Sequence, residues 1–174
     1  MFVIKTNAYS YETVIIDFPD DEGWHSVLYL RNEKEAIVQF LPRGETKDNW
    51  TRSVVFHSFK GENDKLNAKK LQNRLITQSI QKNKTLRYKM LKNNQDDTLT
   101  YWCVDKNEIM PSQCELLRTT QGHESTISIH YIDKNKKTLN SLSRYWYNII
   151  RDTRIYYSYY RMDRLLNRAT IFEL

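Results

Sequence analysis

Four strand-like runs between residues 86 and 132, joined by short turn-rich connections, constrain the fold of this chain more than any other feature. Each run is rich in the β-branched and aromatic residues that strands favour, and the connections contain the Asn, Asp, Pro and Gly typical of turns. Because short connections join antiparallel neighbours, the pattern predicts a β-meander. The runs are LRYKML at 86–91, TLTYWCV at 98–104, QCELLRT at 113–119 and STISIHYI at 125–132.

The register expected of the middle hairpin places Cys103 beside Cys114 and Tyr101 beside Leu116. These two cysteines are the only ones in the sequence. They are too few for a four-ligand zinc site and are not spaced as a redox CxxC pair. Facing each other, they could form a disulfide in an oxidising compartment, whereas in the cytosol we expect buried thiols.

A second group of extended runs precedes the meander and predicts a β-rich start. In its third run, Ala36, Val38 and Phe40 share one face while Ile37 and Leu41 lie on the other, so a helix or a sheet layer should cover at least one side. The runs are YETVIIDF at 11–18, SVLYL at 26–30, EAIVQFL at 35–41 and SVVFHSF at 53–59.

Two helices complete the expected order. Asp64 is predicted to cap a helix that ends near Lys82, and Thr138 to cap a second helix. Apolar residues recur at helical spacing in both segments, and the resulting stripes should pack on the sheet. The stripes are Ala68, Leu71, Leu75, Ile76 and Ile80 in the first helix, and Leu139, Leu142, Trp146 and Ile149 in the second.

This order predicts an α+β fold with a predominantly antiparallel sheet covered by helices and a C-terminal helical or extended appendage. A length of 174 residues with 40% hydrophobic residues fits one such domain. We expect that domain at 1–150 and a Tyr/Arg-rich segment at 151–174, either docked or partner-binding. The order of elements resembles that of the Mog1/PsbP-like sandwich, a likeness that implies no particular activity.

Charge is distributed unevenly along the chain. The net charge is +6, yet residues 60–92 alone hold ten basic and two acidic side chains. A cationic helix face of this kind is typical of a solvated surface, an acidic partner or nucleic acid. The candidate basic surface consists of Lys65, Lys69, Lys70 and Arg74.

The C-terminal segment is the main candidate for partner binding. Tyrosine supplies a large contact area at small entropic cost and arginine supplies planar, multidentate recognition, so both are favoured at binding hot spots. Stacking on unpaired bases uses the same residue types. The candidate contact residues are Arg151, Arg154, Tyr156, Tyr157, Tyr159, Tyr160, Arg161, Arg164 and Arg168.

Catalytic and metal-binding motifs are weak. The sequence contains no HExxH and no GxSxG. His57 and His130 could approach one another on neighbouring strands near Glu115, and such a trio could bind metal or transfer protons. We nevertheless expect a non-enzymatic protein with no catalytic residue, cofactor or metal, and keep an enzyme with an unrecognised site as an alternative.

The segment LPRGETKDNWT at 41–51 resembles a GETxxNWT-type motif of small bacterial domains. In physical terms we expect Gly44 to form a turn, Asn49 or Thr51 to bond exposed backbone, and Trp50 to anchor the connection against the core. The richness in Asn, Lys, Ile and Tyr resembles proteins of AT-rich intracellular bacteria, including accessory and secreted proteins of type IVB secretion systems. The resemblance implies a secretion or virulence role.

The sequence therefore predicts a protein-interaction domain, an adaptor or accessory component, with nucleic-acid binding through residues 60–92 as the second hypothesis. No stretch approaches the length of a membrane span, and the N-terminus lacks the features of a secretory signal. We expect a cytoplasmic protein, with export by a specialised system or a removed N-terminal segment left open. The oligomeric state is also open.

Overall fold

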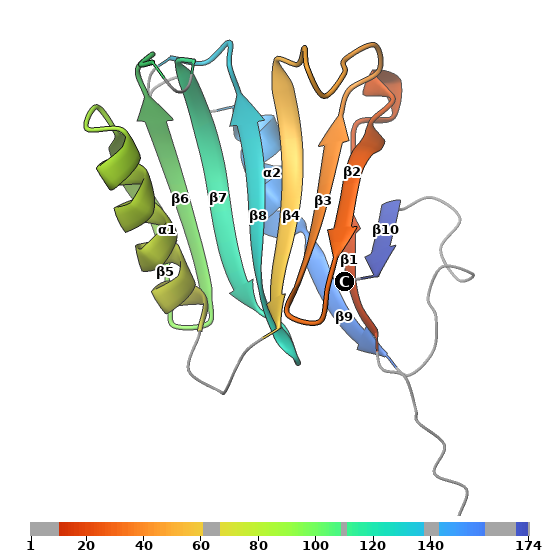
Figure 1. The fold of residues 1–174 in the computed structure, drawn as a ribbon. Coiled ribbons are helices and arrows are strands. Elements are labelled where there is room, and N and C mark those ends of the chain that lie inside the picture. The colour runs from red at the N-terminus through yellow and green to blue at the C-terminus, as the bar shows by residue number, and fades with distance from the viewer. Residues whose placement is uncertain (1–10, 61–66, 109–110, 138–142, 159–169, 174) are drawn as a thin grey trace, which may run out of the picture.

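The computed structural model describes residues 11–60, 67–108, 111–137, 143–158 and 170–173, and Figure 1 shows their arrangement. Every strand pair in it is antiparallel. The large sheet has the order β2 (His25–Arg31), β3 (Glu35–Leu41), β4 (Arg52–Lys60), β8 (Ser125–Asp133), β7 (Gln113–Gln121), β6 (Asp97–Val104) and β5 (Arg87–Asn93). The small sheet has the order β10 (Thr170–Glu173), β1 (Tyr11–Ile16) and β9 (Arg154–Ser158). The helices are α1 (Ala68–Lys82), α2 (Arg144–Asp152) and a short 3-10 turn at Asp20–Glu22. The predicted α+β class with a mainly antiparallel sheet is confirmed.

The middle hairpin has the register that the sequence predicts. Cys103 pairs with Cys114 and Tyr101 pairs with Leu116. The two cysteines are joined by a disulfide, so the expectation of buried thiols is wrong. Directly opposed residues of an antiparallel pair place their Cβ atoms close enough for this bond, which closes the β6–β7 hairpin.

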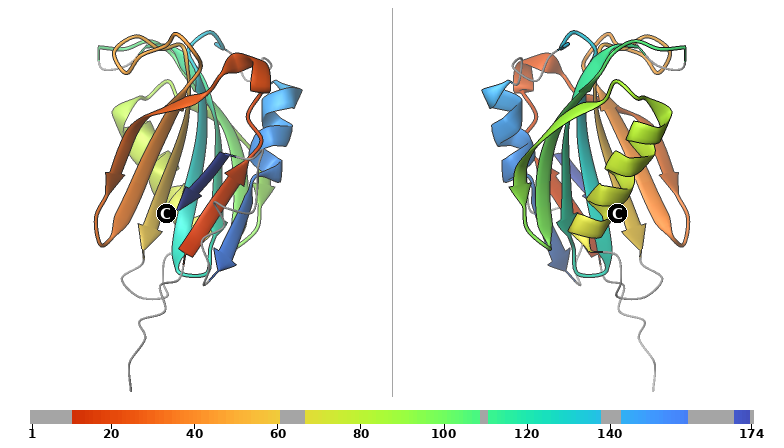
Figure 2. Two further views of the ribbon diagram at one scale, coloured as in Figure 1. Left: turned by 90° about the vertical axis from the view of Figure 1, so that its right-hand side faces the viewer. Right: turned by 90° about the vertical axis from the view of Figure 1, so that its left-hand side faces the viewer.

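The two helices lie on opposite faces of the large sheet, as the two views in Figure 2 show. The Thr119 hydroxyl donates to the carbonyl of Ala68 in α1 at 2.8 Å. The neighbouring Arg118 donates to the carbonyls of Ile150 and Thr153, at the end of α2, at 3.1 and 2.7 Å. Because adjacent residues of a strand point to opposite faces, α1 covers one face, and α2 with the small sheet covers the other.

The main core fills the space between the large sheet, the small sheet and α2. Val14 of β1, Phe56 of β4 and Ile150 of α2 are fully buried there. Trp146 stacks on Tyr131 with ring centroids 4.0 Å apart. Each such side chain contributes roughly 1.5–3 kcal/mol on burial, which fixes α2 on this face.

Helix α1 ends at Lys82, as predicted, but it differs from the prediction in its N-cap and in the face that is buried. Asn67 caps it, with its side chain accepting from the Lys70 amide, while the predicted cap Asp64 lies outside the described residues. Gln72 is completely buried, and Ile80 is 42% exposed instead of packing on the sheet. The face of α1 that packs on the sheet includes Gln72. The helix is therefore rotated by about one residue from the orientation that its apolar residues alone indicate.

Helix α2 begins later than expected. Ser143 is its N-cap, and its hydroxyl accepts from the Trp146 amide at 3.5 Å. Trp146 and Ile150 are buried, while the predicted cap Thr138 lies outside the described residues. Arg118 closes the other end of α2 by donating to its terminal carbonyls, which have no partner within the helix.

The C-terminal segment supplies both neighbours of β1. Residues 154–158 form β9 along one side of β1, and residues 170–173 form β10 along the other. The predicted boundary at residue 150 falls inside α2. A single residue, Thr153, separates the end of α2 from the start of β9. None of the helices described is long and apolar enough to span a membrane.

Candidate functional site

The described residues of the C-terminal segment divide into two groups. Arg154 is exposed and Tyr156 is 38% exposed. Arg151 instead forms a two-bond pair with Asp152 at 2.7 Å, and Tyr157 stacks on His123 and donates to Glu124 at 3.1 Å. Five further predicted contact residues lie outside the described residues: Tyr159, Tyr160, Arg161, Arg164 and Arg168.

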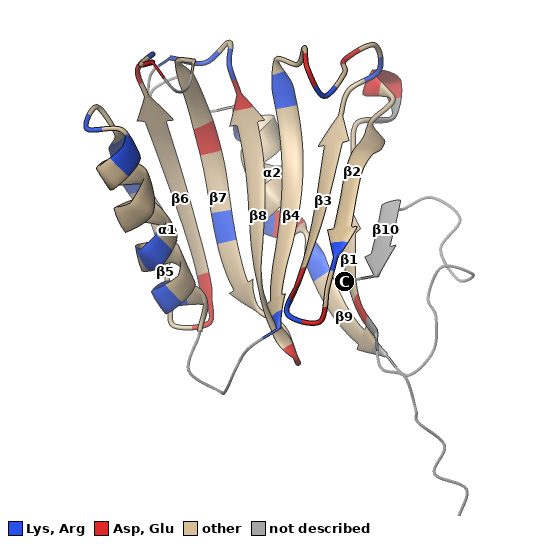
Figure 3. Ribbon diagram, in the orientation of Figure 1, with Lys and Arg blue, Asp and Glu red and all other residues tan. Residues whose placement is uncertain are grey.

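The predicted basic surface is present in part. Lys69, Lys70 and Arg74 of α1 are exposed, and Lys65 lies outside the described residues. Figure 3 shows blue segments of Lys and Arg along α1. These side chains lie on the α1 face of the large sheet, whereas Arg154 belongs to the small sheet on the other face. The described residues therefore do not join the two cationic regions into one surface.

The α1 face of the large sheet has two unlike halves. We call the part beneath α1, on β6, β7 and β8, the covered half, and the part formed by β2, β3 and β4 the open half (Figure 1). Register places Leu30, Ile37 and His57 in one row across the open half. Leu30 is 54% exposed and the other two are half-buried, so this row of mostly apolar side chains faces solvent.

The two edges of the large sheet also differ. The register shifts by one residue in both edge strands, between Ser26 and Leu28 in β2 and between Met90 and Lys92 in β5, which disrupts pairing locally. Edge strand β5 contains Arg87, Lys89 and Lys92, whereas β2 contains the exposed Tyr29 and Leu30, each 54% exposed. Charged side chains, lysines above all, protect an edge from pairing with another chain, so β2 is the less protected edge.

His57 and His130 lie on neighbouring strands, as the sequence suggested, and both lie on the α1 face, but each belongs to a separate pair. His57 donates from Nε2 to Glu35 at 2.8 Å. His130 Nδ1 lies 2.6 Å from the Glu115 carboxylate. Burial, together with the nearby His130, lowers the pKa of His57 below its ordinary value of 6.5, and the Glu35 carboxylate opposes this shift without overcoming it. Among the described residues no group of three or more metal-ligating side chains converges.

Ser128, His130 and Glu115 form a chain of hydrogen bonds. His130 Nε2 lies 2.8 Å from the Ser128 hydroxyl, and the opposite ring nitrogen bonds Glu115. A neutral ring protonated at Nδ1 satisfies both contacts. The same connectivity activates serine nucleophiles, yet Ser128 is completely buried in the middle of β8. Because no substrate atom can reach a fully covered oxygen, this chain of bonds does not support acyl transfer.

A pocket of about 220 Å³ lies where the last turn of α1 meets β6, β7 and β8. Leu75 and Lys82 line it from the helix, and Trp102, Glu115 and His130 line it from the sheet. Glu115 is 5% exposed, and within the described part of the chain its carboxylate has His130 as its hydrogen-bond partner. The pocket therefore has a carboxylate in its floor and a lysine in its wall.

Hydrogen bonds to the Glu45 carboxylate hold the 41–51 segment together, and the sequence did not predict them. Gly44 has a φ of 84°, which confirms the predicted turn. Glu45 accepts from the amide and hydroxyl of Thr51 and from the Arg52 amide. Burial works against ionisation of Glu45, but these hydrogen bonds prevail and lower its pKa.

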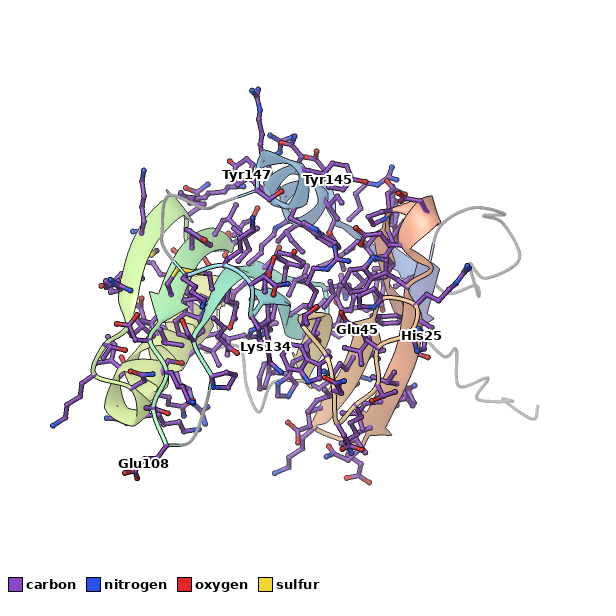
Figure 4. All side chains as sticks on the ribbon, turned by 90° about the horizontal axis from the view of Figure 1, so that it is seen from above. His25, Glu45, Glu108, Lys134, Tyr145 and Tyr147 are labelled. Carbon is purple, nitrogen blue, oxygen red and sulfur yellow. A yellow bond between two sulfur atoms is a disulfide. The ribbon has the colours of Figure 1, made fainter. Side chains whose placement is uncertain are left out.

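Trp50 does not anchor the segment against the core, which corrects the expectation. The Lys134 ammonium lies 3.4 Å from the centre of its ring and also donates to its carbonyl at 3.0 Å. Figure 4, viewed from above, shows Lys134 and Glu45 at this end of the sheet. A cation–π contact at the surface fixes Trp50, so its role is structural.

The disulfide bears on the compartment as well as the fold. Cys103 lines the pocket through its place in β6, and its bond to Cys114 holds the two strands that carry Trp102 and Glu115. Disulfides persist mainly in oxidising compartments, so the bond is at odds with the predicted cytoplasmic location.

Comparison with protein-family models, with curated proteins and with solved structures gave no match. The resemblance of residues 41–51 to small bacterial domains, and the implied link to secretion, therefore stay predictions.

Proposed function

We propose that this domain is a non-enzymatic protein-interaction module that receives an extended segment of a partner along the free edge of β2. The observation that carries the proposal is the position of β2 at the end of the large sheet, with no described strand on its outer side. The unpaired backbone groups of such an edge can bind another extended chain, a recognition mode known as β-augmentation.

Side chains on both faces of β2 would add specificity to this backbone pairing. Leu30 lies in register with Ile37, and Tyr29 lies in register with Val38. Both β2 residues are 54% exposed. A segment paired with β2 would place alternate side chains beside Leu30 on the open half and beside Tyr29 on the other face. We therefore expect a partner segment with apolar residues at consecutive positions, one for each face.

The test is a selection of short random peptides, displayed on phage, against the intact chain. Selected peptides should carry apolar residues at consecutive positions and should lose affinity by at least about tenfold for the double variant Tyr29→Lys/Leu30→Lys. Tyr88→Lys is the matched control, because Tyr88 is 47% exposed on the opposite edge strand. Failure to enrich any peptide, or equal loss with Tyr88→Lys, would overturn the proposal.

The C-terminal segment needs a different test from simple truncation. Deleting residues 154–174 would remove β9 and β10, and with them both strand partners of β1. Substituting Arg154 and Tyr156 leaves the backbone pairing in place and probes their exposed side chains. An adaptor role in bacterial secretion or virulence would give these surfaces a natural partner, and it rests on composition alone.

Nucleic-acid binding is the second candidate, and the exposed Lys69, Lys70 and Arg74 favour it. Binding to single-stranded RNA should weaken steeply as salt is raised, and Lys70→Met/Arg74→Met should reduce both the affinity and the salt slope. No binding at low salt would eliminate this candidate.

A further inference from the structure

We propose that the pocket between α1 and strands β6–β8 binds a small zwitterion of the free α-amino acid class, with an apolar side chain. This site is separate from β2 and does not depend on the proposed partner. Its volume of about 220 Å³ lies below the roughly 300–1,000 Å³ of pockets for drug-sized ligands. The size points to a small metabolite and not to a nucleotide cofactor.

The floor of the pocket would recognise an ammonium group. Glu115 is only 5% exposed. Burying a carboxylate costs free energy unless it is paired and hydrogen-bonded. Among the described residues, His130 is its hydrogen-bond partner and binds one oxygen, Oε1. A carboxylate offers about four lone-pair sites, so capacity remains toward the pocket that Glu115 lines.

The helix wall would recognise a carboxylate. Lys82 and Ser79 are three residues apart on α1, a spacing that places them on one face of the helix, and both line the pocket. Within the described residues the Lys82 ammonium forms no ion pair, and its side chain is exposed at the rim. An amino acid with its ammonium on Glu115 and its carboxylate toward Lys82 would satisfy both charges. A plain cation would leave Lys82 as a repelling neighbour.

The remaining walls suit an apolar side chain. Trp102, Leu75 and Val104 line the pocket with aromatic and aliphatic surface. The Asn83 side chain donates to the Asp105 carbonyl at 3.0 Å, which ties the end of α1 to the end of β6. The disulfide between Cys103 and Cys114 holds the two sheet strands that form the floor. The pocket is therefore framed by fixed elements, as ligand sites commonly are.

The first experiment compares leucine with its two fragments, 3-methylbutylamine and 4-methylpentanoic acid, by calorimetric titration of the intact chain. Leucine should bind at least about tenfold more tightly than either fragment, because each fragment leaves one charged protein group without its partner. Equal binding of the amine, equal binding of the acid, or no binding of leucine would each overturn the proposal.

Variants test the assignment of each charge. Glu115→Gln keeps the shape of the side chain and should abolish measurable leucine binding, and Lys82→Met should weaken it about tenfold. Lys70→Met, on the outer face of the same helix, is the matched control and should leave binding unchanged. Tighter binding by Lys82→Met would show that Lys82 itself occupies the pocket, and would overturn the proposal. If Glu115→Gln fails to fold, the fragment series on the unaltered chain still decides.

Discussion

The covered and open halves of the large sheet differ because a single helix is too narrow to cover all of its strands. An α-helix is roughly 10–12 Å across, and strands are spaced roughly 4.8 Å apart, so one helix covers about two or three strands. Helix α1 lies over β6, β7 and β8 and forms polar contacts with these strands, such as the hydrogen bond from the Thr119 hydroxyl to the Ala68 carbonyl. Among the described residues, none of the helices covers the open half on β2, β3 and β4, which presents Leu30, Ile37 and His57.

This difference assigns a different kind of ligand to each half. A pocket with fixed walls lies between the C-terminal turn of α1 and the sheet, which suits a small molecule. On the open half, where the described part of the chain places neither a helix nor a strand beyond β2, a sheet edge and an apolar row remain, which suits an extended segment.

The largest expected effect concerns Leu71, a leucine of α1 that packs on the covered half. Leu71→Ala should lower the free energy of unfolding by about 3 kcal/mol, because Leu71 is 1% exposed and its removal leaves a cavity. Leu30→Ala in the open half should cost less than about 0.5 kcal/mol. Denaturant unfolding of the two variants measures both values. Equal costs would mean that the open half is covered in solution.

The next largest effect concerns the disulfide beneath the covered half. Replacing Cys103 and Cys114 by alanine should lower the free energy of unfolding by about 2–3 kcal/mol, since the bond closes a short loop in the unfolded chain. Titration of free thiols in the unaltered protein after denaturation, with and without reductant, checks that the disulfide is present. Two reactive thiols without reductant would contradict the bond and restore the predicted cytosolic chemistry.

The smallest effect is a pH dependence in the open half. The folded-state pKa of His57 lies below its ordinary value of 6.5, so the unfolded chain binds the proton more tightly. The contribution of His57 is therefore complete above about pH 6.5 and is lost as the pH falls below that value. Unfolding free energies across this range should decline less steeply for His57→Gln than for the unaltered chain. His25→Gln, an exposed histidine of β2, is the control, and an equal flattening by it would contradict the assignment.

Much of the large sheet could be predicted from the sequence, because alternation and turn residues are local signals. All eight predicted strands are present with ends within two residues of those expected, and the register of Cys103 with Cys114 was correct. The pairing of β1 with β9 and β10 was not predictable in this way. It joins residues 11–16 to residues 154–158 and 170–173, and local patterning carries no information about such distant partners.

The candidate sites were less accessible to sequence reasoning than the fold. The sequence drew attention to Glu115 and His130, and these two residues do form a hydrogen-bonded pair. It did not indicate Lys82 or Trp102 as pocket residues, since the rotation of α1 on the sheet depends on the burial of Gln72, a polar residue. It also did not show that β2 would lie at the edge, because strand order follows from long-range pairing and not from the pattern within a strand.

Amide hydrogen exchange along β2, with and without a selected peptide, tests the central claim most directly. In the free chain, the β2 amides that point away from β3 should exchange quickly, whereas the paired amides of β4 should be protected. Addition of the peptide should slow the outward amides of β2 and leave the amides of β5 unchanged. Outward β2 amides that are already as protected as those of β4, or that stay unprotected when the peptide is bound, would contradict the account.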